Sequence, residues 1–193
     1  MNELAMLHTM QHGFLLRSDR MDTFIKSEEM HQATLQALQD RGVGLLDIAQ
    51  ITLFLQSKYV PGLTIETCLE NVEQVLEKRE VQNAILTGVA LDVMAEQHAL
   101  PQPLQHIIET DESLYGVDEI LALSILNIYG SIGYTNYGYV DKLKYGILDW
   151  LNDKKNGTHT FMDDLAGAVA AAAASRLAHR YRSLQEQEQE LNE

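Results

Sequence analysis

Acidic side chains next to apolar runs are the part of this sequence best suited to chemistry. Asp118 and Glu119 directly precede a run of aliphatic residues, and Asp163 and Asp164 precede the alanine-rich stretch in "HTFMDDLAGAVAAAAASRLAH". Each acid could simply cap a helix N-terminus, where the helix dipole favours negative charge. Repetition of this pattern in the C-terminal half favours a shared metal site. Since its ligands would be carboxylate oxygens, without a Cys/His cluster, we expect Mg²⁺ or another divalent cation.

Three further residues complete the candidate catalytic set. Asp111 lies seven residues before Asp118, and Asp141 is followed by Lys144 one helical turn later. We expect Asp111 and Asp141 to bind the metal or to lie beside it, with Lys144 as a neighbouring cation. His159, one turn before the aspartate pair, is a candidate for substrate binding. The alternative for His159 is a surface-loop histidine.

Several common hydrolase devices are missing from the sequence. There is no GxxxxGK[ST] loop, GxSxG elbow, HExxH motif or Asp-x-Asp pair, and Cys68 does not begin a Cys-x5-Arg motif. A side-chain nucleophile is therefore disfavoured. The remaining chemistry is hydrolysis by water that a metal ion activates.

A second group of acids lies at helical spacing in the N-terminal half: Glu66, Glu70, Glu73, Glu77 and Glu80. The simplest interpretation is a solvated helix surface. One alternative pairs these residues with Asp92 and Glu96, as in the all-α nucleotide pyrophosphohydrolases that bind magnesium through helix-borne acids. A different class also stays open, a non-catalytic helical protein in which the metal is a structural element.

Composition limits the partners of this chain. Of its 193 residues 46% are hydrophobic and 22% charged, which is typical of a globular domain. The net charge of −14 argues against nucleic acid as a partner and against an anionic membrane bound by charge alone. The single cysteine, Cys68, excludes an intramolecular disulfide and fits a reducing compartment. Without a secretory signal or a transmembrane run, we expect a cytoplasmic protein, with peripheral membrane contact left open.

Helical periodicity dominates the chain and predicts an all-α, single-domain bundle of about six or more helices. Residues 1–21 are left unassigned, 22–185 form the domain, and 186–193 form a charged tail. Abundant amphipathic helices favour a homo-oligomer. The small side chains of the last helix should allow its aspartate pair to approach the Asp118–Glu119 helix. The expected helices span residues 22–40, 45–59, 64–78, 81–97, 104–109, 117–132, 136–152 and 160 to beyond 182, with a Gly-Tyr-rich link at 129–139.

These acidic motifs resemble those of the phosphatidylglycerophosphatase A family, and more closely its soluble, YutG-like branch from Gram-positive bacteria. The family's D-x6-DE motif matches Asp111, Asp118 and Glu119, and its D-x2-K segment matches residues 141–144. Its DD-x-x-AG motif is close to "DDLAG" at 163–167, with one spacer residue fewer. The resemblance implies a Mg²⁺-dependent phosphatase that acts on phosphatidylglycerophosphate or a soluble phosphate ester. It also implies that Lys144 neutralises charge that develops on phosphoryl oxygens.

The family's glycine-rich PGT-x-GS signature has only a faint counterpart here. It corresponds to "VPGLT" at residues 60–64, where Thr64 is the residue that the resemblance places at the substrate. The membrane enzymes of the family also span the bilayer, and this chain has no run that could do so. The acid cluster is therefore retained without the membrane apparatus.

Overall fold

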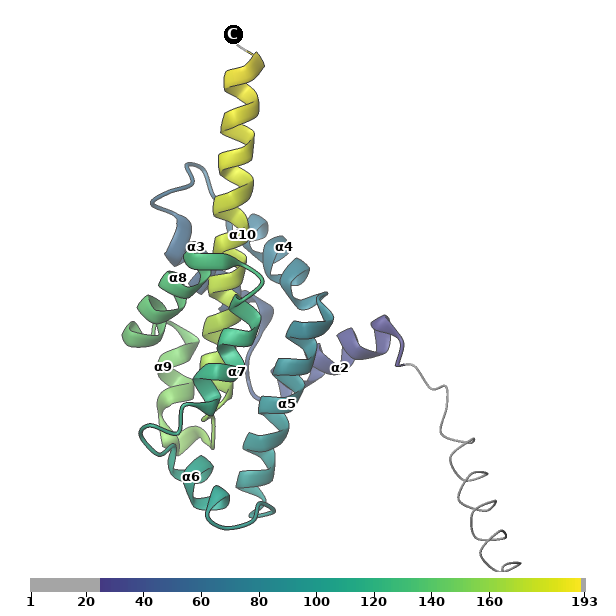
Figure 1. Ribbon diagram of the computed structural model, residues 1–193, viewed down its shortest axis with the longest axis vertical. Helices are drawn as coiled ribbons and strands as arrows, with labels where there is room; N and C mark the ends of the chain where they lie inside the picture. Colours follow the sequence, from purple (N-terminus) through teal and green to yellow (C-terminus); the bar gives the residue numbers. More distant parts are fainter. Residues whose placement is uncertain (1–24, 192–193) are drawn as a thin grey trace, which may run out of the picture.

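A long C-terminal helix, α10 (Met162–Leu191), runs through the centre of the protein (Figure 1). The computed structural model describes residues 25–191, and all regular structure within this range is helical. The predicted all-α fold is thus confirmed. The remaining elements are α2 (Ser27–Asp40), α3 (Leu45–Gln56), α4 (Ile65–Leu76), α5 (Arg79–Glu96), α6 (Leu104–Thr110), α7 (Val117–Leu126), α8 (Gly130–Leu143), α9 (Ile147–Asn152) and the 3₁₀ turn η1 (Lys154–Asn156).

The alanine-rich part of α10 is the core of the domain. Residues 165–174 are buried without exception, and α3, α4, α5, α7 and α8 pack against this helix. Small side chains let the surrounding helices approach its backbone closely. Gly88 on α5 shows how close this packing is, because a Cβ there would lie 2.5 Å from Leu165 Cδ1 and 2.9 Å from Phe161 Cβ. The small side chains of α10 therefore explain why this helix lies at the centre of the bundle.

The region between residues 117 and 152 differs from the prediction. The first expected helix ends at Leu126, and the expected Gly-Tyr-rich link is itself helix α8. The prediction of a non-helical link was wrong because this segment packs against α10 as a helix, with Tyr137 and Val140 buried on one face. Lys144 then adopts the left-handed conformation with φ 47°, so the helix expected over 136–152 divides into α8 and α9.

The first and last described helices begin at slightly different residues than predicted. Helix α10 begins at Met162 rather than Thr160 and continues through the predicted tail to Leu191. Helix α2 begins at Ser27, and the predicted segment 1–21 lies outside the described residues. None of the described helices is both long enough and apolar enough to cross a membrane.

Candidate active site

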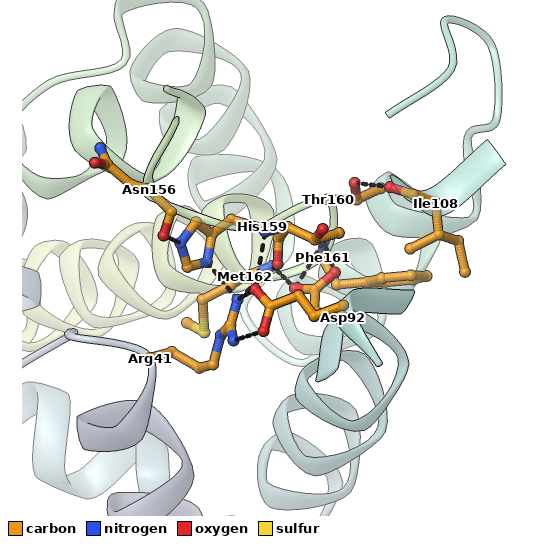
Figure 2. Close-up of polar contacts among 10 residues, drawn as sticks. Arg41, Asp92, Ile108, Asn156, His159, Thr160, Phe161 and Met162 are labelled. Carbon is orange, nitrogen blue, oxygen red and sulfur yellow. Dashed lines mark hydrogen bonds and ion pairs between the residues drawn. The ribbon is translucent and has the colours of Figure 1, made fainter. Parts of the chain in front are cut away.

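The N-terminus of α10 is fixed by Asp92, which lies on the buried face of α5. Its carboxylate accepts hydrogen bonds from the backbone N–H groups of Phe161, at 3.1 Å, and Met162, at 3.0 Å (Figure 2). Burial raises the pKa of Asp92 to about 8, although the two backbone N–H donors act in the opposite direction. Asp92 is therefore the carboxylate that caps this helix, and the aspartate pair that follows is left for other contacts.

The loop that enters α10 is tied to three other elements. Arg41, just after α2, binds Glu96 of α5 through two hydrogen bonds of 2.7 and 2.9 Å. The same guanidinium donates to the carbonyl oxygen of Thr158 at 2.7 Å. Thr160 Oγ1 donates to the carbonyl oxygen of Ile108 on α6 at 2.6 Å (Figure 2). These contacts determine where the first turn of α10 lies.

Lys144 connects two of the predicted acids. Its ammonium group donates to Asp141 Oδ1 at 2.6 Å and to Asp163 Oδ2 at 2.8 Å. Burial alone would lower the pKa of Lys144, but the carboxylates of Asp163 and Asp141 raise it above its ordinary value. Lys144 is therefore a protonated cation held between α8 and α10.

The two adjacent aspartates have different partners. Asp164 is buried, and its Oδ1 accepts a hydrogen bond of 2.7 Å from the hydroxyl of Tyr137 on α8. Burial, followed by the neighbouring charge of Asp163, raises the pKa of Asp164 to about 8. Burial and the charge of Asp164 also raise the pKa of Tyr137, so this phenol stays a neutral donor. Asp163 thus contacts a cation, whereas Asp164 contacts a neutral hydroxyl.

We expect Asp164 to make the metal-free protein less stable as the pH rises. An unfolded aspartate titrates near pH 4, whereas the pKa of Asp164 is about 8 in the folded state. The folded state therefore holds this proton more tightly, and its stability should fall between about pH 4 and about pH 8. The Asp164→Asn protein should lose this part of the pH dependence. Urea unfolding in the presence of a chelator, at several pH values, measures it, and equal slopes for both proteins would contradict it.

Asp118 and Asp111 lie near Lys144 and Asp163. Asp118 is buried, and burial, followed by the charge of Asp111, raises its pKa, whereas Lys144 lowers it. The charge of Asp111 also contributes to the raised pKa of Asp163. Asp111 itself is exposed and forms a 3.7 Å ion pair with Lys154. We call the six residues that the fold gathers here the acid cluster: Asp111, Asp118, Asp141, Lys144, Asp163 and Asp164.

A small cavity opens beside the acid cluster. Asp111, Asp163 and His159 are among its lining residues, and its volume of about 20 Å³ is room for roughly one water molecule. Asp111, which lines the cavity, and Lys144 of the acid cluster both have left-handed backbone conformations, with φ 52° and φ 47°. Left-handed conformations are unfavourable for residues with a Cβ and concentrate at functional sites. Backbone strain and buried charge thus coincide at one place.

His159 lines this cavity, but its ring is already engaged. Nδ1 lies 3.0 Å from an Arg41 nitrogen, which can only donate, so Nε2 carries the proton and donates to the carbonyl oxygen of Asn156 at 3.2 Å. Burial and the nearby Arg41 charge lower the pKa of His159. The imidazole is therefore neutral, with both nitrogens hydrogen-bonded. Its role in substrate binding stays a prediction.

Two of the candidate residues are not joined to the acid cluster. Glu119 is exposed, and its backbone N–H donates to Asp118 Oδ1 at 2.9 Å. Thr64 caps α4 by accepting a hydrogen bond from the backbone N–H of Thr67 at 3.3 Å. Within residues 25–191, no hydrogen bond or ion pair connects either side chain to the cluster. A metal-binding role for Glu119 and a substrate-binding role for Thr64 both stay predictions.

The donor chemistry of the acid cluster suits Mg²⁺, because its ligands would be carboxylate oxygens. Over the described part of the chain, however, no three His, Cys, Asp or Glu side chains are already arranged around one point as metal ligands. The ammonium group of Lys144 lies between Asp141 and Asp163 instead. The acids of this site therefore fit a divalent ion by type, and binding would require their side chains to converge.

The second acidic group forms no such site. All five glutamates, Glu66, Glu70, Glu73, Glu77 and Glu80, are exposed. Asp92 is occupied by the cap of α10, and Glu96 by Arg41. The interpretation of a solvated helix surface agrees with this arrangement, and the ligand set of a pyrophosphohydrolase is not assembled.

Three residues that organise the site were not assigned these roles from the sequence: Arg41, Asp92 and Tyr137. Asp92 carried a usable signal, because it follows Ile85 and Val89 at helical spacing and so lies on the apolar face of its helix. A carboxylate in that position must find a buried partner. Tyr137 was only one of several tyrosines that could line a pocket, and Arg41 had no distinguishing pattern.

The fold and the site thus define a class of protein: an all-α domain in which buried acids surround a lysine. Residues 41–179 match the family phosphatidylglycerophosphatase A, and the chain belongs to this family. The resemblance inferred from the acid motifs is confirmed.

Three relatives show how far the similarity extends. The uncharacterized protein YutG of Bacillus subtilis is 61% identical over 161 residues, which are 81% of this chain and 97% of that protein. The crystal structure of the low temperature requirement C protein of Listeria monocytogenes has a TM-score of 0.79 at 61% identity and covers 81% of this chain and 99% of that one. The crystal structure of YpjQ from Bacillus subtilis also has a TM-score of 0.79, at 56% identity, and covers 82% of this chain and 99% of that one.

Proposed function

We propose that this protein is a phosphatase that hydrolyses a phosphomonoester with the help of a divalent cation, Mg²⁺ being the expected ion. The observation that carries the proposal is the acid cluster around Lys144 at the start of α10. Membership of the phosphatidylglycerophosphatase A family supports it. The proposed substrate is phosphatidylglycerophosphate or a soluble phosphate ester.

Asp118, Asp163 and Asp164 are the residues that would hold the ion. All three are largely buried, and their pKa values are raised chiefly by burial. Carboxylates crowded in this way repel one another, and a cation among them would relieve the repulsion. When bound, a divalent ion would supply electrophilic activation of the phosphate and of water. Tyr137 would hold one oxygen of Asp164 in place through its 2.7 Å hydrogen bond.

Lys144 would bind the phosphate of the substrate. Its protonated ammonium group is positioned by Asp141 and Asp163, so its orientation is determined before any ligand arrives. A preorganised cation of this kind stabilises negative charge that develops on phosphoryl oxygens. Asp141 would then be a positioning residue, and Asp111 would lie at the rim of the cavity.

A panel of phosphomonoesters tests the proposal. Phosphate release would be measured with and without Mg²⁺, and the panel would include phosphatidylglycerophosphate in detergent micelles. We expect release from at least one ester, and only with a divalent ion present. Metal binding without hydrolysis of any ester would instead favour the non-catalytic alternative.

We expect divalent metal to raise the thermal stability of the protein. A ligand that binds only the folded state stabilises it by mass action, by about 2.7 kcal/mol at a concentration of about 100 Kd. Thermal unfolding after chelation, with Mg²⁺, Mn²⁺ or Ca²⁺ added back, measures the effect. Sodium chloride at matched ionic strength is the control for screening. An unfolding temperature indifferent to all three ions would count against the shared site.

Replacing Lys144 by alanine should lower turnover more than it lowers metal affinity. A cation that acts on the phosphoryl group need not touch the metal, and its loss should cost about 10²-fold in kcat. Lys142→Ala is the matched control, because Lys142 is an exposed lysine at the end of the same helix. Steady-state kinetics and metal titration measure the two effects. Equal losses in both would make Lys144 a structural partner of the acids.

A further inference from the structure

The last turns of α10 extend away from the helices that bury its first half (Figure 1). Residues 165–175 are buried, whereas every residue from 182 to 191 is exposed. A helix segment of this length is only marginally stable in water without tertiary packing. The outer turns would therefore be stabilised by a packing partner, and the described residues of this chain do not provide one.

The apolar side chains of this projecting segment follow a coiled-coil pattern. Positions spaced alternately four and three residues apart form a single stripe, which we call the seam: Leu177, Tyr181, Leu184, Glu188 and Leu191. Leu177 is buried in the domain, but Leu184 is 50% and Leu191 86% exposed. A repeat of 3.5 residues is the period at which two helices pack along their length, and a single polar seam residue favours one register. The seam thus predicts a helical partner.

Charge along the same segment indicates what that helix is. Basic residues come first, with Arg180 and Arg182, and acidic residues follow, with Glu186 and Glu190. Two such helices in parallel would place like charges side by side. In antiparallel orientation the basic half of each would lie along the acidic half of the other, and this arrangement has the two-fold symmetry of an isologous contact.

The base of the projecting segment has polar groups that such a partner would satisfy. Arg176 and Arg180 line a pocket against α4 together with Asn71 and the two glutamates Glu70 and Glu73. Arg176 Nε and Asn71 Oδ1 are buried without a hydrogen-bond partner, and no ion pair within the described residues involves Arg180. On the other side, Ala178 lines a second pocket with Tyr59, which is 70% exposed. The glutamate-rich end of an antiparallel helix would reach this base.

We propose that two copies of this chain form a dimer by pairing the projecting residues 181–191 of α10 antiparallel to each other. The seam supplies the apolar contact, and the opposed charges set the orientation. This interface lies at the opposite end of α10 from the acid cluster. The proposal therefore stands independently of the phosphatase function, and its variants should leave activity unchanged.

Sedimentation of the full-length protein, over a range of concentrations, tests the dimer. We expect the parent to be dimeric and Leu184→Lys to weaken self-association by more than about tenfold, because it places a charge in the seam. Ser183→Lys is the matched control, since it adds the same charge one residue away on the outer face and should still dimerise. Unfolding curves for both variants verify that the domain is intact. A monomeric parent, or a Leu184→Lys protein that dimerises as well as the parent, would overturn the proposal.

Charge variants test the antiparallel orientation. A variant with Arg180→Glu and Arg182→Glu has an acidic segment throughout, and one with Glu186→Lys and Glu190→Lys has a basic segment. In an antiparallel pair each variant alone should lose self-association, and an equimolar mixture should recover it as a heterodimer. A parallel pair would show little change in the acidic variant, because like charges face each other before and after the substitution. That result would overturn the orientation.

Discussion

Asp163→Asn and Asp164→Asn proteins should fold like the parent but release phosphate more slowly by about 10²-fold or more. Asparagine keeps the shape of aspartate and removes one negative charge. At position 163 this change removes the 2.8 Å ion pair with Lys144, and at position 164 it removes a carboxyl group that could ionise to bind a metal ion beside Tyr137. Both substitutions should also reduce the gain in thermal stability on adding Mg²⁺. Phosphate release and metal-dependent unfolding, measured on the same preparations, separate a loss of function from a loss of fold.

The control for this pair is Asp149→Asn on α9. It removes the same charge from an exposed position and should leave both phosphate release and the metal response unchanged. The cap of α10 does not confound the experiment, since Asp92 supplies it. Asp163→Asn and Asp164→Asn proteins as active and as metal-responsive as the parent would show that the pair has no part in the reaction.

Replacing Asp92 by alanine should destabilise the protein by about 2–3 kcal/mol. The carboxylate is fully buried and accepts the N–H groups of Phe161 and Met162, which alanine would leave without a partner. Because these groups open the helix that carries Asp163 and Asp164, the same variant should also lower phosphate release. Urea unfolding at neutral pH measures the change in the free energy of unfolding.

Asp92→Asn separates the cap from the charge. Asparagine keeps an oxygen acceptor for the helix N-terminus and carries no charge that must be buried. We therefore expect it to cost well under about 1 kcal/mol. An alanine variant as stable as the parent, or an asparagine variant as unstable as alanine, would contradict the role of Asp92 as a helix cap.

The helical architecture could be predicted from the sequence because its signals are local. Apolar residues recur at three- and four-residue steps, and this period reports which face of a helix is buried wherever the helix lies. The same logic marked the alanine-rich stretch as a thin central helix and singled out acids beside apolar runs. Residues 129–139 misled the prediction, because glycine and tyrosine are typical of links, yet Tyr137 and Val140 are buried on one face of α8.

The arrangement of the acids depended on contacts between distant segments, which the tertiary structure alone decided. Asp92 caps a helix that begins 70 residues later along the chain, and Tyr137 reaches Asp164 across 27 residues. Lys144 was predicted to act with Asp141, but its second partner, Asp163, depends on how α8 and α10 pack. Spacing along one helix indicates which residues share a face. It does not indicate which buried polar groups meet across a core, because that follows from the packing of all the helices together.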